Sequence, residues 1–235
     1  MSARLVVVSG TGTEIGKTHV SAALLVAWRG ITPDARILGL KPVESGVDVG
    51  AQGADVQTLE QASTFHVKRF PSPYLLARAV SPHLAARAEG RTVELPPIVE
   101  QVRAARAEVD LLLVELAGGL FSPLSASLLN LDAAAALAPD HHLLVAPDRL
   151  GVLHDVGATI RAARAASPTS VPTAIVLVAP ELSDRSTGTN AAELAVVTDV
   201  PVVAVVPRGS IEECAAALAG FASVSSGRPA QHCSG

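Results

Sequence analysis

The chain has 235 residues, of which 49% are hydrophobic and 17% charged, and its formal net charge is −4. This length and hydrophobic content suffice for one α/β domain, and two domains are not expected. The net charge gives no electrostatic footprint for nucleic acid or an anionic membrane surface, and no apolar run is long enough to cross a bilayer. Cys214 and Cys233 lack the spacing of a disulfide framework or metal site, and no secretory signal opens the chain, so we expect a cytoplasmic protein.

Short apolar segments alternate with helical stretches along the chain. The strand candidates are apolar on both faces, as in a buried parallel sheet. Their alternation with helices predicts a single doubly wound α/β domain with helices on both faces of the sheet. The predicted strands are 4–9, 36–41, 111–115, 142–146, 173–178 and 201–206.

The predicted helices lie between these strands and after the last of them. Residues 66–95 interrupt the alternation with three prolines and are predicted to form a loop or irregular insertion. Residues 222–235 are predicted to form a flexible tail. The predicted helices are 16–29, 54–63, 97–107, 127–138, 153–166, 189–197 and 211–221.

The segment from Gly10 to Thr18 reads Gly-Thr-Gly-Thr-Glu-Ile-Gly-Lys-Thr, between a predicted strand and a helix. This context is typical of a phosphate loop, whose backbone N–H groups and helix N-terminus hold phosphates. Lys17 would reach the β- and γ-phosphates, and the Thr18 hydroxyl would bind Mg²⁺. The strict pattern would have a glycine at Thr11, so the loop is one residue longer. The alternative is an ordinary Gly-rich turn.

Three charged residues stand near the ends of predicted elements on the ligand edge of the sheet. Lys41 ends the second strand and is one of only three lysines in the chain. Asp55 opens a helix, and Glu115 ends a very apolar strand, where an unpaired carboxylate is costly. We interpret Glu115 as a ligand of Mg²⁺. The alternatives are a solvated charge for Lys41, a helix cap for Asp55 and a structural ion pair for Glu115.

Four segments, taken in order, resemble dethiobiotin synthetase over about residues 4–207. The first is the longer phosphate loop, and the second, from Lys41 to Gly46, matches Lys-Pro-x-x-Ser/Thr-Gly. The others match the family's middle loop and its Glu-Gly-Ala-Gly-Gly segment with the proline that follows. They are Pro73-Tyr74, Ser81-Pro82-His83 and Glu89-Gly90 for the middle loop, and Glu115-Leu-Ala-Gly-Gly119 with Ser122-Pro-Leu-Ser125 for the last.

The resemblance implies an enzyme that uses ATP to close the ureido ring of dethiobiotin from 7,8-diaminononanoate and CO₂. It implies that Lys17 and Lys41 are catalytic, and that Thr18, Asp55 and Glu115 contact Mg²⁺ directly or through water. The implied nucleotide site comprises Thr13, Glu14, Ile15, Gly16, Lys17, Thr18, His19, Asp55, Glu115 and Gly118.

The resemblance also implies a substrate site that two subunits of a homodimer share. Thr13, Ser45 and the turn from Glu115 to Gly118 would line the diamine site. A helix N-terminus of the partner subunit would hold the substrate carboxylate. The corresponding segment of this chain is Leu150, Gly151, Val152, Leu153 and His154.

Three departures from the family pattern carry expectations of their own. Leu116 replaces a glycine, and Asp155 follows His154 where the family has Asn-His. Val178-Ala179-Pro180 replaces the asparagine that reads adenine, and proline offers no donor. The enzyme is therefore expected either to select adenine less strictly or to read the base through Pro207, Arg208 and Gly209.

Three other functions stay open from the sequence. A partner-binding ATPase of the partitioning and septum-site class would usually carry a second lysine inside the loop, and residues 11–15 contain none. A cobyrinate-type amidoligase would usually continue into a glutaminase domain, for which the chain has no room. A nucleotide-binding paralogue without ureido chemistry is the third.

Overall fold

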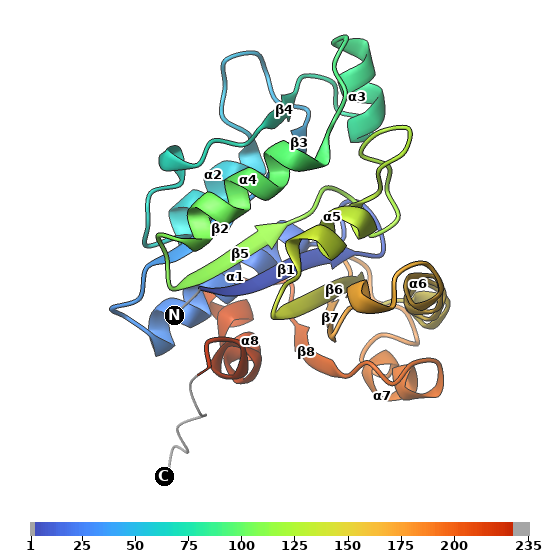
Figure 1. Ribbon diagram of the computed structural model, residues 1–235. Helices are drawn as coiled ribbons and strands as arrows, with labels where there is room; N and C mark the ends of the chain where they lie inside the picture. The colour runs from blue at the N-terminus through green and yellow to red at the C-terminus, as the bar shows by residue number, and fades with distance from the viewer. Residues whose placement is uncertain (1–2, 228–235) are drawn as a thin grey trace.

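The computed structural model describes residues 3–227 and contains a six-stranded parallel sheet (Figure 1). The strand order is β2-β5-β1-β6-β7-β8, so that β1 lies between β5 and β6. All six predicted strands are confirmed, with ends shifted by one residue at most. Their bounds are β1 Arg4–Gly10, β2 Ile37–Leu40, β5 Leu111–Glu115, β6 His141–Pro147, β7 Ala174–Val178 and β8 Val202–Val206.

Helices cover both faces of the sheet, as predicted for a doubly wound fold. Successive side chains of a strand point to opposite faces. Thus Val6 and Val8 of β1 pack in the core under α1 (Lys17–Ile31) and α8 (Ile211–Ser225). Leu5 and Val7 pack in the core on the opposite face. The helices over that face are α4 (Leu95–Arg106), α5 (Asn130–Leu137) and α6 (Val152–Ala166), while α2 (Ala54–Ala62) lies beside β2 and α1.

Residues 66–95 are more regular than the sequence predicted. They contain a 3₁₀ turn η1 (Val67–Arg69), the strand β4 (Tyr74–Leu76) and the helix α3 (Pro82–Ala88). The strand β4 pairs in parallel with β3 (Val43–Ser45), and neither strand was predicted. Pro82 was expected to interrupt regular structure. It instead occupies the first turn of α3, where its missing N–H costs nothing. Two three-residue strands carry too little periodicity to be seen.

The C-terminal part of the chain differs from the prediction in two further places. The predicted helix 189–197 is a short α7 (Asn190–Glu193) followed by a 3₁₀ turn η3 (Leu194–Val196), and another turn, η2 (Pro168–Ser170), precedes β7. The predicted tail from residue 222 is wrong for its first residues, because α8 continues to Ser225. The indole Nε1 of Trp28 donates to the buried Ser225 hydroxyl at 3.0 Å, which ties α8 to α1. Residues 228–235 lie outside the described residues.

No helix within residues 3–227 is long and apolar enough to cross a membrane.

His142 offers a test of the core through the pH dependence of stability. Its ring lies 2.8 Å from the Ser9 hydroxyl and 3.2 Å from the Ser170 carbonyl oxygen, and burial lowers its pKa to about 4. Between this value and the ordinary 6.5, the unfolded chain binds a proton that the folded chain does not. The free energy of unfolding therefore falls as the pH falls through this window, by about 1.4 kcal/mol per pH unit.

We expect His142→Leu to remove this slope, since leucine cannot bind the proton. Urea unfolding at several pH values from 4 to 6.5 measures it. The variant should be less stable than the wild type at pH 7, because the Ser9 hydroxyl loses its best partner. Parallel stability curves for the two proteins would contradict the assignment.

Candidate active site

A cavity of about 480 Å³ opens at the carboxyl edge of the sheet. The loop after β1, the start of α1, the segment around β3 and the start of α2 line it, with loops after β4 and β5. Twelve of the predicted site residues line this cavity together. They are Thr13, Glu14, Ile15, Gly16, Lys17, Thr18, His19, Lys41, Ser45, Asp55, Glu115 and Gly118.

The phosphate loop curls over the N-terminus of α1. Gly16 takes the left-handed conformation, with φ of 89°, directly before the helix, and Glu14 takes it with φ of 56°. The Lys17 ammonium donates to the Gly12 carbonyl oxygen at 2.7 Å. Gly10 is needed for space, because a Cβ there would lie 2.6 Å from the Ile15 side chain. The loop thus holds a lysine and the first N–H groups of a helix at one point, as phosphate binding requires.

The pKa of Lys17 is lowered to about 8, chiefly by burial and further by the positive charge of Lys41. Its neutral form is therefore accessible near physiological pH while no anion is bound. A bound polyphosphate would favour the charged ammonium, because an opposite charge nearby stabilises it.

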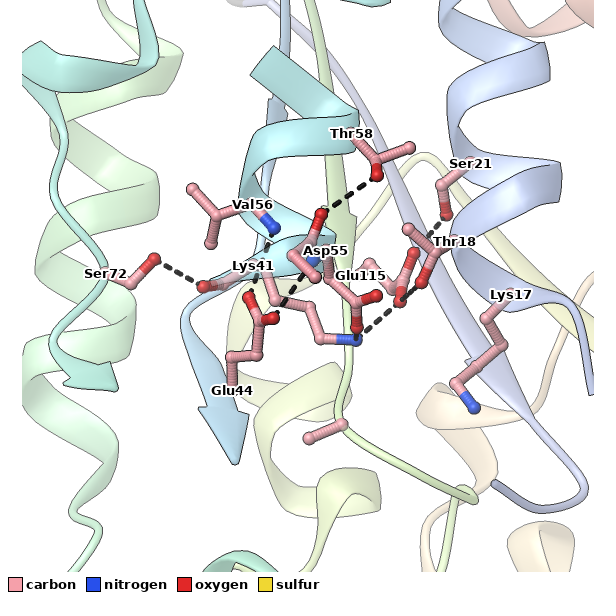
Figure 2. A network of polar contacts seen from close by, with 12 residues as sticks. Lys17, Thr18, Ser21, Lys41, Glu44, Asp55, Val56, Thr58, Ser72 and Glu115 are labelled. Atoms are coloured by element: carbon pink, nitrogen blue, oxygen red, sulfur yellow. Dashed lines mark hydrogen bonds and ion pairs between the residues drawn. The ribbon is translucent and has the colours of Figure 1, made fainter. Parts of the chain in front are cut away.

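Lys41 lies between two carboxylates deep in the cavity (Figure 2). Its Nζ is 2.5 Å from Glu115 Oε1 and 2.8 Å from Asp55 Oδ2. Burial alone would favour the neutral amine, but Glu115 and Asp55 hold the pKa of Lys41 above its ordinary value. The group is therefore a fixed positive charge. The ion pair given as the alternative for Glu115 is present in this structure.

Glu115 is fully buried at the end of β5, where hydroxyl groups also contact it. The Thr18 hydroxyl donates to Oε1 at 2.8 Å, and the Ser21 hydroxyl donates to Oε2 at 2.7 Å. Burial would raise the pKa of Asp55, but the charge of Lys41 and hydrogen bonds from Lys41 and Thr18 hold it below its ordinary value. Asp55 is therefore kept ionised beside the phosphate loop.

The oxygen atoms of Thr18, Asp55 and Glu115 are donors of the kind that Mg²⁺ prefers. Asp55 and Glu115 already hold the positive charge of Lys41, and the Thr18 hydroxyl contacts Glu115. No cluster of three or more acidic, histidine or cysteine side chains that could hold a metal occurs among residues 3–227. The donor set fits Mg²⁺ that keeps phosphate oxygens and water as its remaining ligands, which is the usual pattern for nucleotide-bound magnesium.

The opposite wall of the cavity carries an unsatisfied polar group. The Ser45 hydroxyl oxygen is buried without a hydrogen-bond partner. Buried hydroxyls are normally bonded, so this one marks a place for a ligand atom. The turn after β5 is held from behind, because the Asn130 amide donates to the carbonyl oxygens of Ala117 at 2.5 Å and Gly119 at 2.9 Å.

Leu116 does not line the cavity, although the sequence placed it in the Glu115–Gly118 turn there. Its side chain is buried in the core on the α4 and α5 face, and its N–H donates to the Val8 carbonyl oxygen at 2.9 Å. A leucine in place of glycine is accommodated because its side chain points away from the site.

Two predicted segments lie outside the cavity lining. Residues 207–209 (Pro207, Arg208 and Gly209) are exposed between β8 and α8, and the Pro207 carbonyl oxygen accepts from the Cys214 thiol at 3.2 Å. Residues 150–154 (Leu150, Gly151, Val152, Leu153 and His154) lie at the start of α6, where Leu150, Gly151 and His154 are exposed, Leu153 is half-buried and Val152 is fully buried in the core. The side chain of Val152 thus packs inside this chain, and the contact of this segment with substrate stays a prediction.

Asp155, the acidic residue that departs from the family pattern, has a basic neighbour. Its Oδ2 lies 3.7 Å from the Arg149 guanidinium on the same exposed surface. Arg149 lies one residue before the segment 150–154 and was not among the predicted site residues.

Ala117 lines the cavity, as predicted for the turn from Glu115 to Gly118, but six other lining residues were not assigned to the site. Ser81, Pro82 and Ser122 lie within segments that carried the family resemblance, which was the signal available for them. Glu44 was visible as a charge beside Lys41. Burial raises its pKa, against the opposing effect of hydrogen bonds from two backbone N–H groups of α2. The full set of six is Glu44, Ala79, Val80, Ser81, Pro82 and Ser122.

Solved structures with a similar fold include an ATPase and a protein complexed with Mg-ADP. The septum site-determining protein MinD from Pyrococcus horikoshii has a TM-score of 0.57 and 19% identity, covering 94% of this chain and 95% of that one. A ParA family ATPase from Chlorobium tepidum has a TM-score of 0.56 and 13% identity, covering 97% and 93%. At such identity these likenesses show the fold alone.

The sequence comparisons are more specific. A family model described as an AAA domain matches residues 4–211. An ATP-dependent dethiobiotin synthetase from Ralstonia nicotianae is 42% identical over 159 residues, 66% of this chain and 68% of that protein. The synthetase from Anaeromyxobacter dehalogenans strain 2CP-C is 37% identical over 201 residues, 85% of this chain and 88% of that protein. With the cavity, the two lysines and the acidic pair in the order that the family's motifs require, the chain belongs to the dethiobiotin synthetase family.

Proposed function

We propose that this protein is an ATP- and Mg²⁺-dependent ligase that closes the ureido ring of dethiobiotin from 7,8-diaminononanoate and CO₂. The observation that carries the proposal is the Lys41 ammonium, kept charged between Glu115 and Asp55 beside the phosphate loop. The unpartnered Ser45 hydroxyl in the same cavity supports a second ligand next to the phosphates. We further propose that the protein acts in the cytoplasm.

The chemistry needs positioning and charge stabilisation more than covalent help from the protein. One amine of the diamine captures CO₂ as a carbamate and releases a proton. The carbamate oxygen attacks the γ-phosphorus, and the bond from that phosphorus to the bridging oxygen breaks, releasing ADP. The second amine then attacks the carbonyl carbon of the mixed anhydride, and inorganic phosphate leaves as the ring closes.

The residues of the cavity divide this work. Lys17 would stabilise the charge on the γ-phosphate, and Lys41 would hold the carbamate against it. Thr13, Ser45 and Gly118 would line the diamine side of the cavity. Mg²⁺ held by Thr18, Asp55 and Glu115 would neutralise charge on the phosphate oxygens.

We propose a homodimer in which the start of α6 completes the substrate site of the partner subunit. Leu150 to His154 do not line this chain's own cavity, but they surround the exposed N-terminus of a 15-residue helix. Such a terminus favours a carboxylate. The guanidinium of Arg149 lies beside Asp155 and would offset the charge that otherwise opposes the substrate.

A partner-binding switch ATPase is the second candidate, because regulators of that kind share the fold. The absence of lysine at residues 11–15 opposes it. A paralogue that binds nucleotide without ureido chemistry is a third. Mass spectrometry of purified protein incubated with diaminononanoate, bicarbonate, Mg²⁺ and ATP distinguishes them. Dethiobiotin is the expected product, and ATP hydrolysis without dethiobiotin would refute the proposal.

Lys41→Ala should abolish dethiobiotin formation while nucleotide binding largely persists. Loss of one preorganised charge at a reacting centre lowers the rate by about 10²–10³-fold. Product formation and ATP affinity are measured separately. Lys68→Ala removes an exposed lysine and serves as the matched control, which should behave as the wild type. Equal activity of the two variants would refute the role of Lys41.

The lowered pKa of Lys17, about 8, predicts how nucleotide affinity depends on pH. Above pH 8 the free protein must take up a proton at Lys17 to bind phosphates. The dissociation constant for ATP should therefore rise toward tenfold per pH unit between pH 8 and 9.5. Titration calorimetry in buffers of different ionisation enthalpy measures the uptake. Lys17→Arg stays protonated and should show a flat profile; an equally steep profile would contradict the prediction.

We propose that the enzyme selects the base of the nucleotide less strictly than the phosphates. Val178 is buried, the Ala179 N–H donates to the Val206 carbonyl oxygen at 3.0 Å, and Pro180 has no N–H. These three residues therefore offer an adenine no side-chain amide and no free backbone donor. ATP, GTP and CTP should support product formation with KM values within about 100-fold of one another. A far stronger preference for ATP would show that another group, such as Arg208, reads the base.

A further inference from the structure

Glu44 is a buried carboxylate in the lining of the cavity. It is the middle residue of β3 (Val43–Ser45) and follows Lys41 by three positions. Its side chain lines the cavity, but the residue is only 7% exposed. The mechanism above gives it no part.

The Glu44 carboxylate accepts hydrogen bonds from the first turn of α2 (Figure 2). Its Oε1 accepts from the Asp55 N–H at 2.9 Å, and its Oε2 accepts from the Val56 N–H at 3.1 Å. The residue before the helix is Gly53, which has no side chain to cap it. The cap is therefore supplied by a different segment of the chain, and a carboxylate suits the positive end of a helix.

Gly53 is suited to this arrangement by its size and not by its backbone. Its φ of −64° is open to any residue. A Cβ at this position would lie 2.1–2.5 Å from three atoms of the Glu44 carboxyl group. Any side chain would displace the carboxylate from the helix.

The two bonds fix the residue whose own side chain reaches the reaction centre. Asp55 presents its N–H to Glu44, while its carboxylate lies 2.8 Å from the Lys41 ammonium. Without the cap, the first turn of α2 would have no side-chain partner for these donors, and helix ends without partners fray. The negative charge of Asp55 disfavours the Glu44 carboxylate beside it. The hydrogen bonds from the N–H groups of Asp55 and Val56 offset this cost.

We propose that Glu44 is a positioning residue that holds Asp55 in place for Mg²⁺-dependent nucleotide binding. This inference rests on the proposed function, in which Asp55 contacts Mg²⁺. Glu44 thereby joins the segment that carries Lys41 and Ser45 to the residue that faces the metal. Outer residues that orient a ligand typically contribute 10–100-fold to metal affinity.

Two variants test the cap from its two sides. Glu44→Gln replaces one acceptor oxygen by a donor that faces an N–H group, and Gly53→Ala displaces the carboxylate without removing it. Asp132→Asn is the matched control, since Asp132 accepts the Leu129 N–H at 2.7 Å at the start of α5, away from the cavity. Circular dichroism checks that each variant is folded.

The first measurement is the Mg²⁺ concentration that gives half of the maximal increase in ATP affinity. We expect it to rise about tenfold or more in Glu44→Gln and in Gly53→Ala. ATP affinity in EDTA and the behaviour of Asp132→Asn should stay at the wild-type level. The second measurement needs no metal: amide hydrogen exchange at Asp55 and Val56 should be faster in both cavity variants.

Asp55→Asn separates this inference from its premise. If Asp55→Asn keeps the wild-type Mg²⁺ dependence, the proposed metal role of Asp55 fails and the inference fails with it. If Asp55→Asn loses the dependence while Glu44→Gln and Gly53→Ala keep it, the inference alone is overturned. Unchanged amide exchange in the folded cavity variants would also overturn it.

Discussion

The buried ion pair between Lys41 and Glu115 is the interaction on which the site depends. Two full charges have been moved out of water to the edge of the sheet, and such a pair is stable only if its geometry and its remaining hydrogen bonds are good. Asp55 supplies a second carboxylate to the lysine, and the hydroxyls of Thr18 and Ser21 complete the contacts of Glu115. Removing one partner would leave an uncompensated buried charge.

The ion pair constrains the sheet as well as the site. The strand β5 lies between β1 and β2, with Glu115 opposite Val8 and Val114 opposite Leu40. This register puts the carboxylate beside the phosphate loop that follows β1 and beside the lysine that follows β2. A shift of one residue would turn Glu115 toward the opposite face, because side chains alternate along a strand. The cores on both faces therefore hold the register that the reaction centre needs.

The charged residues of the site are held by burial and hydrogen bonds, whereas the regions proposed for the nucleotide base and the substrate carboxylate are not. Lys17, Lys41, Asp55 and Glu115 all have buried or bonded positions, and Asn130 braces the turn after β5. By contrast, residues 178–180 present no free donor, and the start of α6 faces solvent. In the proposed function, recognition is concentrated on the phosphates and on the atoms next to them, which is where phosphoryl transfer needs preorganised charge.

Local sequence patterns suffice to predict the sheet, the phosphate loop and the charged residues around it. Buried parallel strands are apolar throughout, and a loop for phosphates needs glycines and a lysine at fixed spacing, so both leave local patterns. The family resemblance added the roles of Ser45, Gly118 and Asp55. Which of these side chains meet depends on the tertiary structure. It placed Leu116 and Val152 in the core, formed β3 and β4 from segments too short to show a period, and extended α8 to Ser225 through its bond with Trp28. It also brought Glu44 to the start of α2. These outcomes depend on contacts between residues far apart in the chain, and no local pattern encodes such contacts.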